Sequence, residues 1–191
     1  ARGEEDIALP KAQKAVVYLC AIAGALSAFL ILGQLFGENS GLPRFDAVEV
    51  GSYELMLLLP LALAGMVCGW VFHAANKGTM CLSHAMGNRP VAKAVLAGVI
   101  LAICGMALPY TMFAGESQAH YLMVGYSAIP AAALIATGFV KCALTPTCLN
   151  LGWRGGHFFP VIFSGVSLGY GFALFTGAAP AFCVAACTSA L

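Results

Sequence analysis

The chain has 191 residues, of which 61% are hydrophobic and only 9% carry a formal charge. Soluble domains are about half apolar and about one quarter charged, so this composition excludes an ordinary soluble globular protein. It also excludes a disordered chain, which needs low hydrophobicity and high charge. The net charge of +1 gives no reason to expect a nucleic-acid partner. The composition predicts an integral membrane protein that crosses the bilayer several times.

Long uncharged stretches divide the chain. Stretches of 23, 22, 22 and 24 residues without a formal charge lie between residues 15 and 140, and the last 37 residues carry none. A helix needs about 20 apolar residues to cross the hydrocarbon core. We predict an all-α fold with these apolar segments: Ala15–Phe36, Tyr53–Ala75, Val91–Leu108, Tyr121–Thr145, Phe158–Phe175 and Ala181–Leu191. The last is too short to cross, so we expect the chain to stop inside an element.

The basic residues predict an orientation. If the first four segments each cross once, one side of the membrane receives Lys11, Lys14, Lys77, Arg89, Lys93 and Lys141. Loops rich in Lys and Arg favour the cytoplasm. We therefore expect residues 1–14 to be a polar cytoplasmic segment ahead of a transmembrane domain over residues 15–191, in a plasma or inner membrane. Lys93 and Lys141 are interpreted as cations near segment ends that reach the membrane interface.

The cysteines and histidines do not have the spacing of a metal or redox site. Eight Cys and four His are spread along the chain without a CxxC or HExxH pattern. Free Cys commonly behaves as a small apolar residue. We therefore predict packing roles for the cysteines, and neither a metal nor a cofactor.

The polar stretch Thr145–Pro160 stands between two apolar segments. Irregular backbone at membrane depth is tolerated where it is buried or lines a cavity. Gly155 and Gly156 let the backbone approach a ligand, and Pro160 suits the first turn of a helix. The start of that helix would present free N–H groups to an anion. The alternative interpretation is a plain turn between two spans, with Arg154 reaching the interface.

The sequence RGGHFFPVIFSGVSLGYG, residues 154–171, resembles the CLC family of chloride channels and chloride/proton antiporters. In that family a Gly-Gly-x-Phe-x-Pro element opens a helix. Three further stretches are similar to the family's second half in the same order: ALAGMVCGWVF (62–72), LPYTMFAGES (108–117) and FCVAACTSAL (182–191). The resemblance implies a multi-helix membrane fold with broken helices, representing part of the second inverted repeat, and a homodimer.

The resemblance also implies functional residues. Backbone amides of His157 and Phe158 would hold a dehydrated chloride, Gly155 and Gly156 would shape the turn, and Pro160 would start the helix. The family usually has an aliphatic residue in place of His157, and we expect the imidazole to face away from the ion.

Channel and antiporter both remain open as modes of transport. Family antiporters carry a proton-transfer glutamate ahead of the span that matches Ala15–Phe36. Glu5 is the candidate, and a solvated acidic terminus is the simpler interpretation. The family's first-half motifs, Gly-Ser-Gly-x-Pro and Gly-Lys/Arg-Glu-Gly-Pro, do not occur in this sequence, nor does its late tyrosine. The resemblance therefore implies a fragment.

Two other functional classes are alternatives. A membrane enzyme could use Arg154 and the Gly-Gly turn to hold a lipid phosphate, although no nucleophile–base pair is evident, so we predict no enzyme. A non-conducting structural or assembly subunit is the second alternative.

Overall fold

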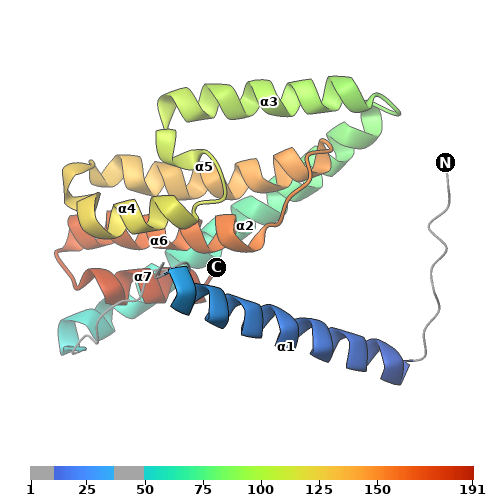
Figure 1. The fold of residues 1–191 in the computed structure, drawn as a ribbon. Coiled ribbons are helices and arrows are strands. Elements are labelled where there is room, and N and C mark those ends of the chain that lie inside the picture. The colour runs from blue at the N-terminus through green and yellow to red at the C-terminus, as the bar shows by residue number, and fades with distance from the viewer. Residues whose placement is uncertain (1–10, 37–49) are drawn as a thin grey trace. The chain divides into compact units, whose positions relative to one another are not determined.

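The computed structural model describes residues 11–36 and 50–191, and the described residues form helices without a strand. The elements in chain order are α1 (Lys11–Phe36), α2 (Ser52–Ala85), α3 (Pro90–Ala107), η1 (Pro109–Thr111), α4 (Glu116–Gly125), η2 (Tyr126–Ala128), α5 (Ala131–Asn150), α6 (Phe158–Thr176) and α7 (Pro180–Ser189) (Figure 1). The predicted all-α fold is confirmed. The chain divides into two units, residues 1–41, which contain α1, and residues 42–191, which contain the other elements.

Four of the described helices are long and apolar enough to cross a membrane. They are α2, α3, α5 and α6. Many apolar side chains on α2 and α3 are exposed, among them Met56, Trp70 and Met106. A helix that faces lipid shows this pattern, because hydrocarbon replaces a protein core around it. Both observations agree with the predicted membrane fold.

The predicted span Tyr121–Thr145 is wrong, because this stretch is two helices. The first, α4, ends at Gly125, and α5 begins only at Ala131 after the 3-10 turn η2. Pro130 stands directly before α5 and accepts hydrogen bonds there from the amides of Ala133 and Leu134. Proline at this point cannot continue the preceding helix. The simple count of four crossings fails as a result, and the orientation of the chain stays a prediction.

Other boundaries also differ from the prediction. Helix α2 continues past Ala75, the predicted end of this segment, to Ala85. Thr79 supports this extension, because its Oγ1 donates to the Ala75 carbonyl at 2.7 Å. Helix α5 likewise continues through Pro146 to Asn150, so only residues 151–157 of the predicted irregular stretch 145–160 lie outside a helix.

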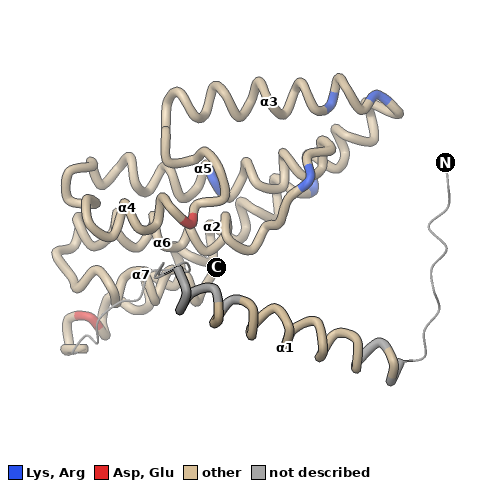
Figure 2. Tube along the Cα trace, in the orientation of Figure 1, with Lys and Arg blue, Asp and Glu red and all other residues tan. Residues whose placement is uncertain are grey.

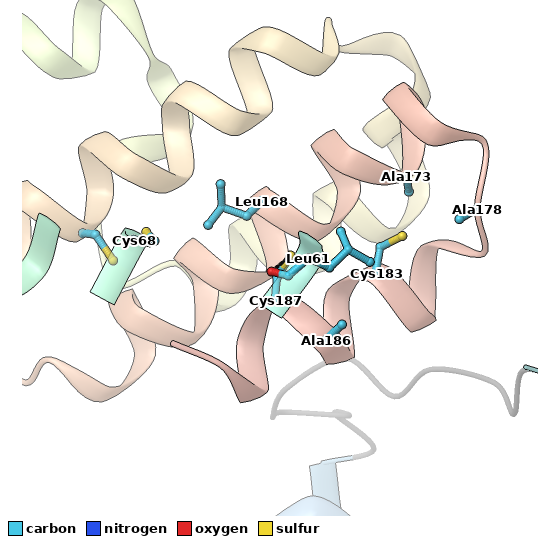
Figure 3. Packing of buried hydrophobic residues seen from close by; sticks show 9 residues of the cluster. Leu61, Cys68, Leu168, Ala173, Ala178, Cys183, Ala186 and Cys187 are labelled. Carbon is cyan, nitrogen blue, oxygen red and sulfur yellow. Dashed lines mark hydrogen bonds between the residues drawn. The ribbon is translucent and has the colours of Figure 1, made fainter. Parts of the chain in front are cut away.

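The main core lies where α2, α5, α6 and α7 meet. Figure 3 shows Leu61 and Cys68 of α2 close to Leu168 of α6 and Cys187 of α7. Four cysteines are buried there as free thiols: Cys68, Cys142, Cys183 and Cys187. For these four, the predicted packing role agrees with the structure.

Small residues let α6 approach its neighbours closely. A Cβ at Gly165 would lie 2.7 Å from the Thr188 Cα of α7. A Cβ at Gly138 of α5 would lie 2.9 Å from the Ser164 carbonyl oxygen of α6. Backbones pack this closely in membranes only where side chains are small. Ser167 adds a buried hydrogen bond of 2.8 Å from its Oγ to the Leu134 carbonyl. Helix α6 is therefore held firmly on two sides.

Four of the five described basic residues of the second unit gather at one end. Figure 2 shows basic positions around the end of α2, the start of α3 and the link before α6, which correspond to Lys77, Arg89, Lys93 and Arg154. Two contacts join these segments. Asn150 Nδ2 donates to Asn76 Oδ1 at 2.9 Å, and Trp153 Nε1 donates to the Ala94 carbonyl at 3.1 Å.

Candidate functional site

A well-defined helix end comes before the predicted site. Helix α5 stops at Asn150, and Gly152 follows with φ +98°. The Trp153 amide donates to the Cys148 carbonyl at 3.0 Å, and the Gly152 amide donates to the Leu149 carbonyl at 3.1 Å. This pair of bonds is the Schellman motif, which needs a left-handed residue and so favours glycine. The chain therefore turns away from α5 at a fixed point.

The start of α6 presents amide groups without internal partners. His157 is the N-cap, and the first intrahelical bond runs from the Val161 amide to the His157 carbonyl at 3.1 Å. Pro160 is the third helical residue and has no N–H, as the sequence predicts for a first turn. Among the described residues, nothing accepts from the amides of Gly156, His157, Phe158 or Phe159. Such a helix end carries a partial positive charge.

A cavity of about 310 Å³ opens beside this turn. The link and α6 contribute Arg154, Gly155, Gly156 and Pro160 to its wall. One face of α5 forms another wall with Lys141, Leu144, Thr145 and Cys148. These residues are spaced three or four apart, so they share one side of the helix. The segment around η1 closes the cavity with Thr111, Phe113 and Ala114.

Lys141 is a buried residue in the middle of a helix and not an exposed cation near a segment end, so that interpretation of it is wrong. The side chain is only 4% exposed and sits in the middle of α5. Its Nζ donates to the carbonyls of Thr111 at 2.6 Å, Met112 at 3.3 Å and Phe113. It also lies 5.9 Å from the centre of the Phe163 ring. The residue therefore cannot count as a loop charge in the orientation argument.

The cavity wall is cationic. Its described lining includes two basic side chains, Lys141 and Arg154, and no carboxylate. The first turn of α6 also contains no acidic residue. Together with the positive end of α6, this arrangement can attract an anion, and it offers a cation no described carboxylate.

The structure brings together only part of the predicted site. Gly155, Gly156 and Pro160 line the cavity, whereas His157 and Phe158 are exposed and are not part of its wall. The His157 ring lies 6.4 Å from the Phe72 ring of α2. Glu5 lies outside the described residues. The sequence analysis did not identify Lys141, Thr145 and Cys148 as cavity residues. A signal for them exists, because a lysine inside an apolar segment with polar residues on the same helix face indicates a functional cavity.

Comparison with known proteins identifies relatives and a family for the chain. The chain is 29% identical over 157 residues to proteins named "Putative ion-transport protein YfeO" from Escherichia coli strains K12 / DH10B and UTI89 / UPEC. The match covers 79% of the chain and 35% of each relative, so the chain spans about a third of their length. No solved structure matches the chain. The model of the family described as "Voltage gated chloride channel" matches residues 8–191, and the chain therefore belongs to this family.

Proposed function

We propose that the full-length protein moves chloride or a similar small anion across a membrane, and that the cavity at the start of α6 lies on the anion's path. The observation that carries this proposal is the cavity wall, which combines the Gly155-Gly156 turn with two cationic side chains and no described carboxylate. Family membership and the relatives' names point to ion transport rather than catalysis. The candidate spans agree with a protein embedded in the bilayer.

Backbone amides would replace the water that the anion loses. The amides of His157 and Phe158 have no described acceptor, and they lie at the positive end of a helix. Donors fixed by the fold can bind an ion without side-chain rearrangement, and neutral donors bind weakly enough to release it. The packing of α6 between α5 and α7 would keep these donors in place.

Three finer points belong to the proposal. The mode is either passive conduction or exchange with protons. The protein forms a homodimer, which light scattering of the detergent-solubilised protein would test. The N-terminus lies in the cytoplasm, as the basic residues gathered at one end of the second unit favour.

The main test is chloride flux from proteoliposomes that contain the full-length protein. We expect chloride efflux when valinomycin clamps the voltage, and an external pH electrode separates the two modes because only an antiporter takes up protons during efflux. The absence of chloride, bromide and nitrate flux would overturn the proposal.

A variant in the turn makes this test specific. A Cβ at Gly156 meets nothing within 4 Å, and Gly156 lines the cavity, so we expect Gly156→Leu to fold and to narrow the cavity. Gly78→Leu is the matched control, since that position is also open and lies outside the cavity wall. We expect Gly156→Leu to reduce chloride flux about tenfold or more, because the leucine side chain would obstruct the path and keep the anion from its donors. Equal flux from both variants would contradict the proposed path.

A further inference from the structure

Lys141 is an unusual residue for its position. It lies inside a candidate membrane span and is 4% exposed. A buried charge is costly unless hydrogen bonds compensate it. Charged residues within membrane helices are therefore rare, and they commonly face a cavity or a partner and serve a function.

The hydrogen bonds of Lys141 fit its charged form. An ammonium group has three N–H donors, and three carbonyls surround this one, those of Thr111, Met112 and Phe113. A neutral amine would have only two N–H donors for three acceptors. Phe113 has φ +58°, a conformation that non-glycine residues adopt at an energetic cost. The bonds to Lys141 therefore both satisfy the ammonium group and hold a strained turn against α5.

No carboxylate of the described residues pairs with this charge. All three acceptors are main-chain carbonyls, which are neutral dipoles and leave the net charge in place. The same side chain lines the cavity together with Gly155 and Gly156. A charge in a low-dielectric region acts over a longer distance than one in water. An anion in the cavity would therefore feel Lys141 even though its N–H groups are occupied elsewhere.

We propose that Lys141 is a fixed positive charge on the anion path, held by the carbonyls of residues 111–113, that raises anion affinity through its field rather than by direct contact. This inference rests on the proposed function. It adds to the site a residue of α5 that attracts the anion by its charge. The competing explanation is a purely structural tie between α5 and the turn around η1.

The experiment compares Lys141→Met, Lys141→Arg and Lys77→Met in the full-length protein, using chloride, bromide and nitrate flux as functions of concentration. Lys77 is exposed on α2 and lies outside the cavity wall, so its variant controls for loss of one positive charge. We expect Lys141→Met to raise the half-saturating concentration of all three anions by a similar factor, about tenfold, as loss of a nearby charge predicts. Lys141→Arg should stay within about threefold of the original protein, because it keeps the charge.

A second pair of variants keeps the Lys141 side chain itself and also serves if Lys141→Met does not fold. Cys148 lies on the same face of α5 and lines the cavity. Cys148→Asp adds a carboxylate that offsets the positive charge, whereas Cys148→Asn has the same size and no charge. We expect the Asp variant to bind anions about tenfold more weakly than the Asn variant.

The outcomes separate the two proposals. No anion flux from the original protein would overturn the proposed function and this inference with it. Flux that keeps the same half-saturating concentration in Lys141→Met would overturn this inference alone. The same result for Cys148→Asp relative to Cys148→Asn would overturn both proposals, because it would place the cavity outside the anion path. A changed order of anion preference, or a lower maximal flux at unchanged affinity, would show a structural tie and would also overturn it.

Discussion

The start and the middle of α6 differ sharply in their surroundings. Phe158 and Phe159 at the start are 64% and 39% exposed, and their amides have no described acceptor. Every residue from Phe163 to Gly171 is buried. One part of the helix therefore presents unpaired donors, while the next part is enclosed by α5 and α7. The comparison teaches that a rigidly packed helix body can hold an exposed polar helix start in a fixed position.

The start of α2 differs from the start of α6, because a carboxylate of its own first turn accepts from a backbone amide. Its first turn contains Glu54, whose Oε2 accepts a hydrogen bond of 3.1 Å from the Gly51 amide. The first turn of α6 has no acidic residue. A helix that supplies its own carboxylate satisfies its positive end internally, whereas α6 leaves that end to a partner from outside.

The largest expected effect comes from breaking the packed part of α6. Gly165→Ala would place a Cβ 2.7 Å from the Thr188 Cα of α7, and backbone cannot move aside as a side chain can. Forcing an extra methyl group into a well-packed interior costs about 1–3 kcal/mol of unfolding free energy. We expect a lower thermal midpoint for the detergent-solubilised protein.

Gly78→Ala is the control for this variant, because a Cβ at residue 78 of α2 meets nothing within 4 Å. Replacing glycine with alanine inside a helix should then stabilise by about 0.5–1 kcal/mol. Equal thermal midpoints for the two variants would show that the close contact of α6 with α7 does not hold the helix.

The start of α6 was largely predictable from the sequence, and the position of Lys141 was not. Gly155, Gly156 and Pro160 predict a turn followed by a helix start, because glycine and proline influence the backbone conformation locally, without tertiary contacts. The position of Lys141 within its helix depends on where that helix begins. A helix over 121–145 places it near the end, whereas the actual α5, which starts at Ala131, places it in the middle.

Hydropathy alone does not show the break ahead of α5, which Pro130 marks locally and tertiary packing completes. The stretch from residue 121 to 140 is uncharged throughout, so composition gives no reason to divide it. In the fold, the Tyr126 ring of η2 stacks on the Tyr170 ring of α6 with centroids 4.6 Å apart. Both rings pack in a second cluster of buried residues between α4, α5, α6 and α7. The cavity wall formed by α5 and the η1 region follows from this arrangement and could not be predicted from local sequence.

The second-largest effect is expected from a variant that gives the start of α6 a carboxylate, as the start of α2 has. Phe159→Glu adds a carboxylate to the first turn, where a negative charge interacts favourably with the positive helix end and competes with an external anion. We expect the half-saturating chloride concentration to rise about tenfold relative to Phe159→Gln, because only the charge differs between the two. Concentration-dependent flux in proteoliposomes measures this ratio, and a ratio near one would mean that the α6 start does not contact the anion.

The smallest effect is expected from removing the carboxylate of α2. Glu54→Ala leaves the Gly51 amide without its acceptor, and loss of such a cap costs about 0.5–1 kcal/mol of unfolding free energy. Chloride flux should stay unchanged, because Glu54 lies outside the cavity wall. A small drop in the thermal midpoint at constant flux would show that the two helix starts differ in purpose: α2 uses its carboxylate to stabilise itself, and α6 lacks one because its amides serve the anion. A loss of flux as large as that in Phe159→Glu would contradict this division, since it would place the start of α2 on the anion path as well.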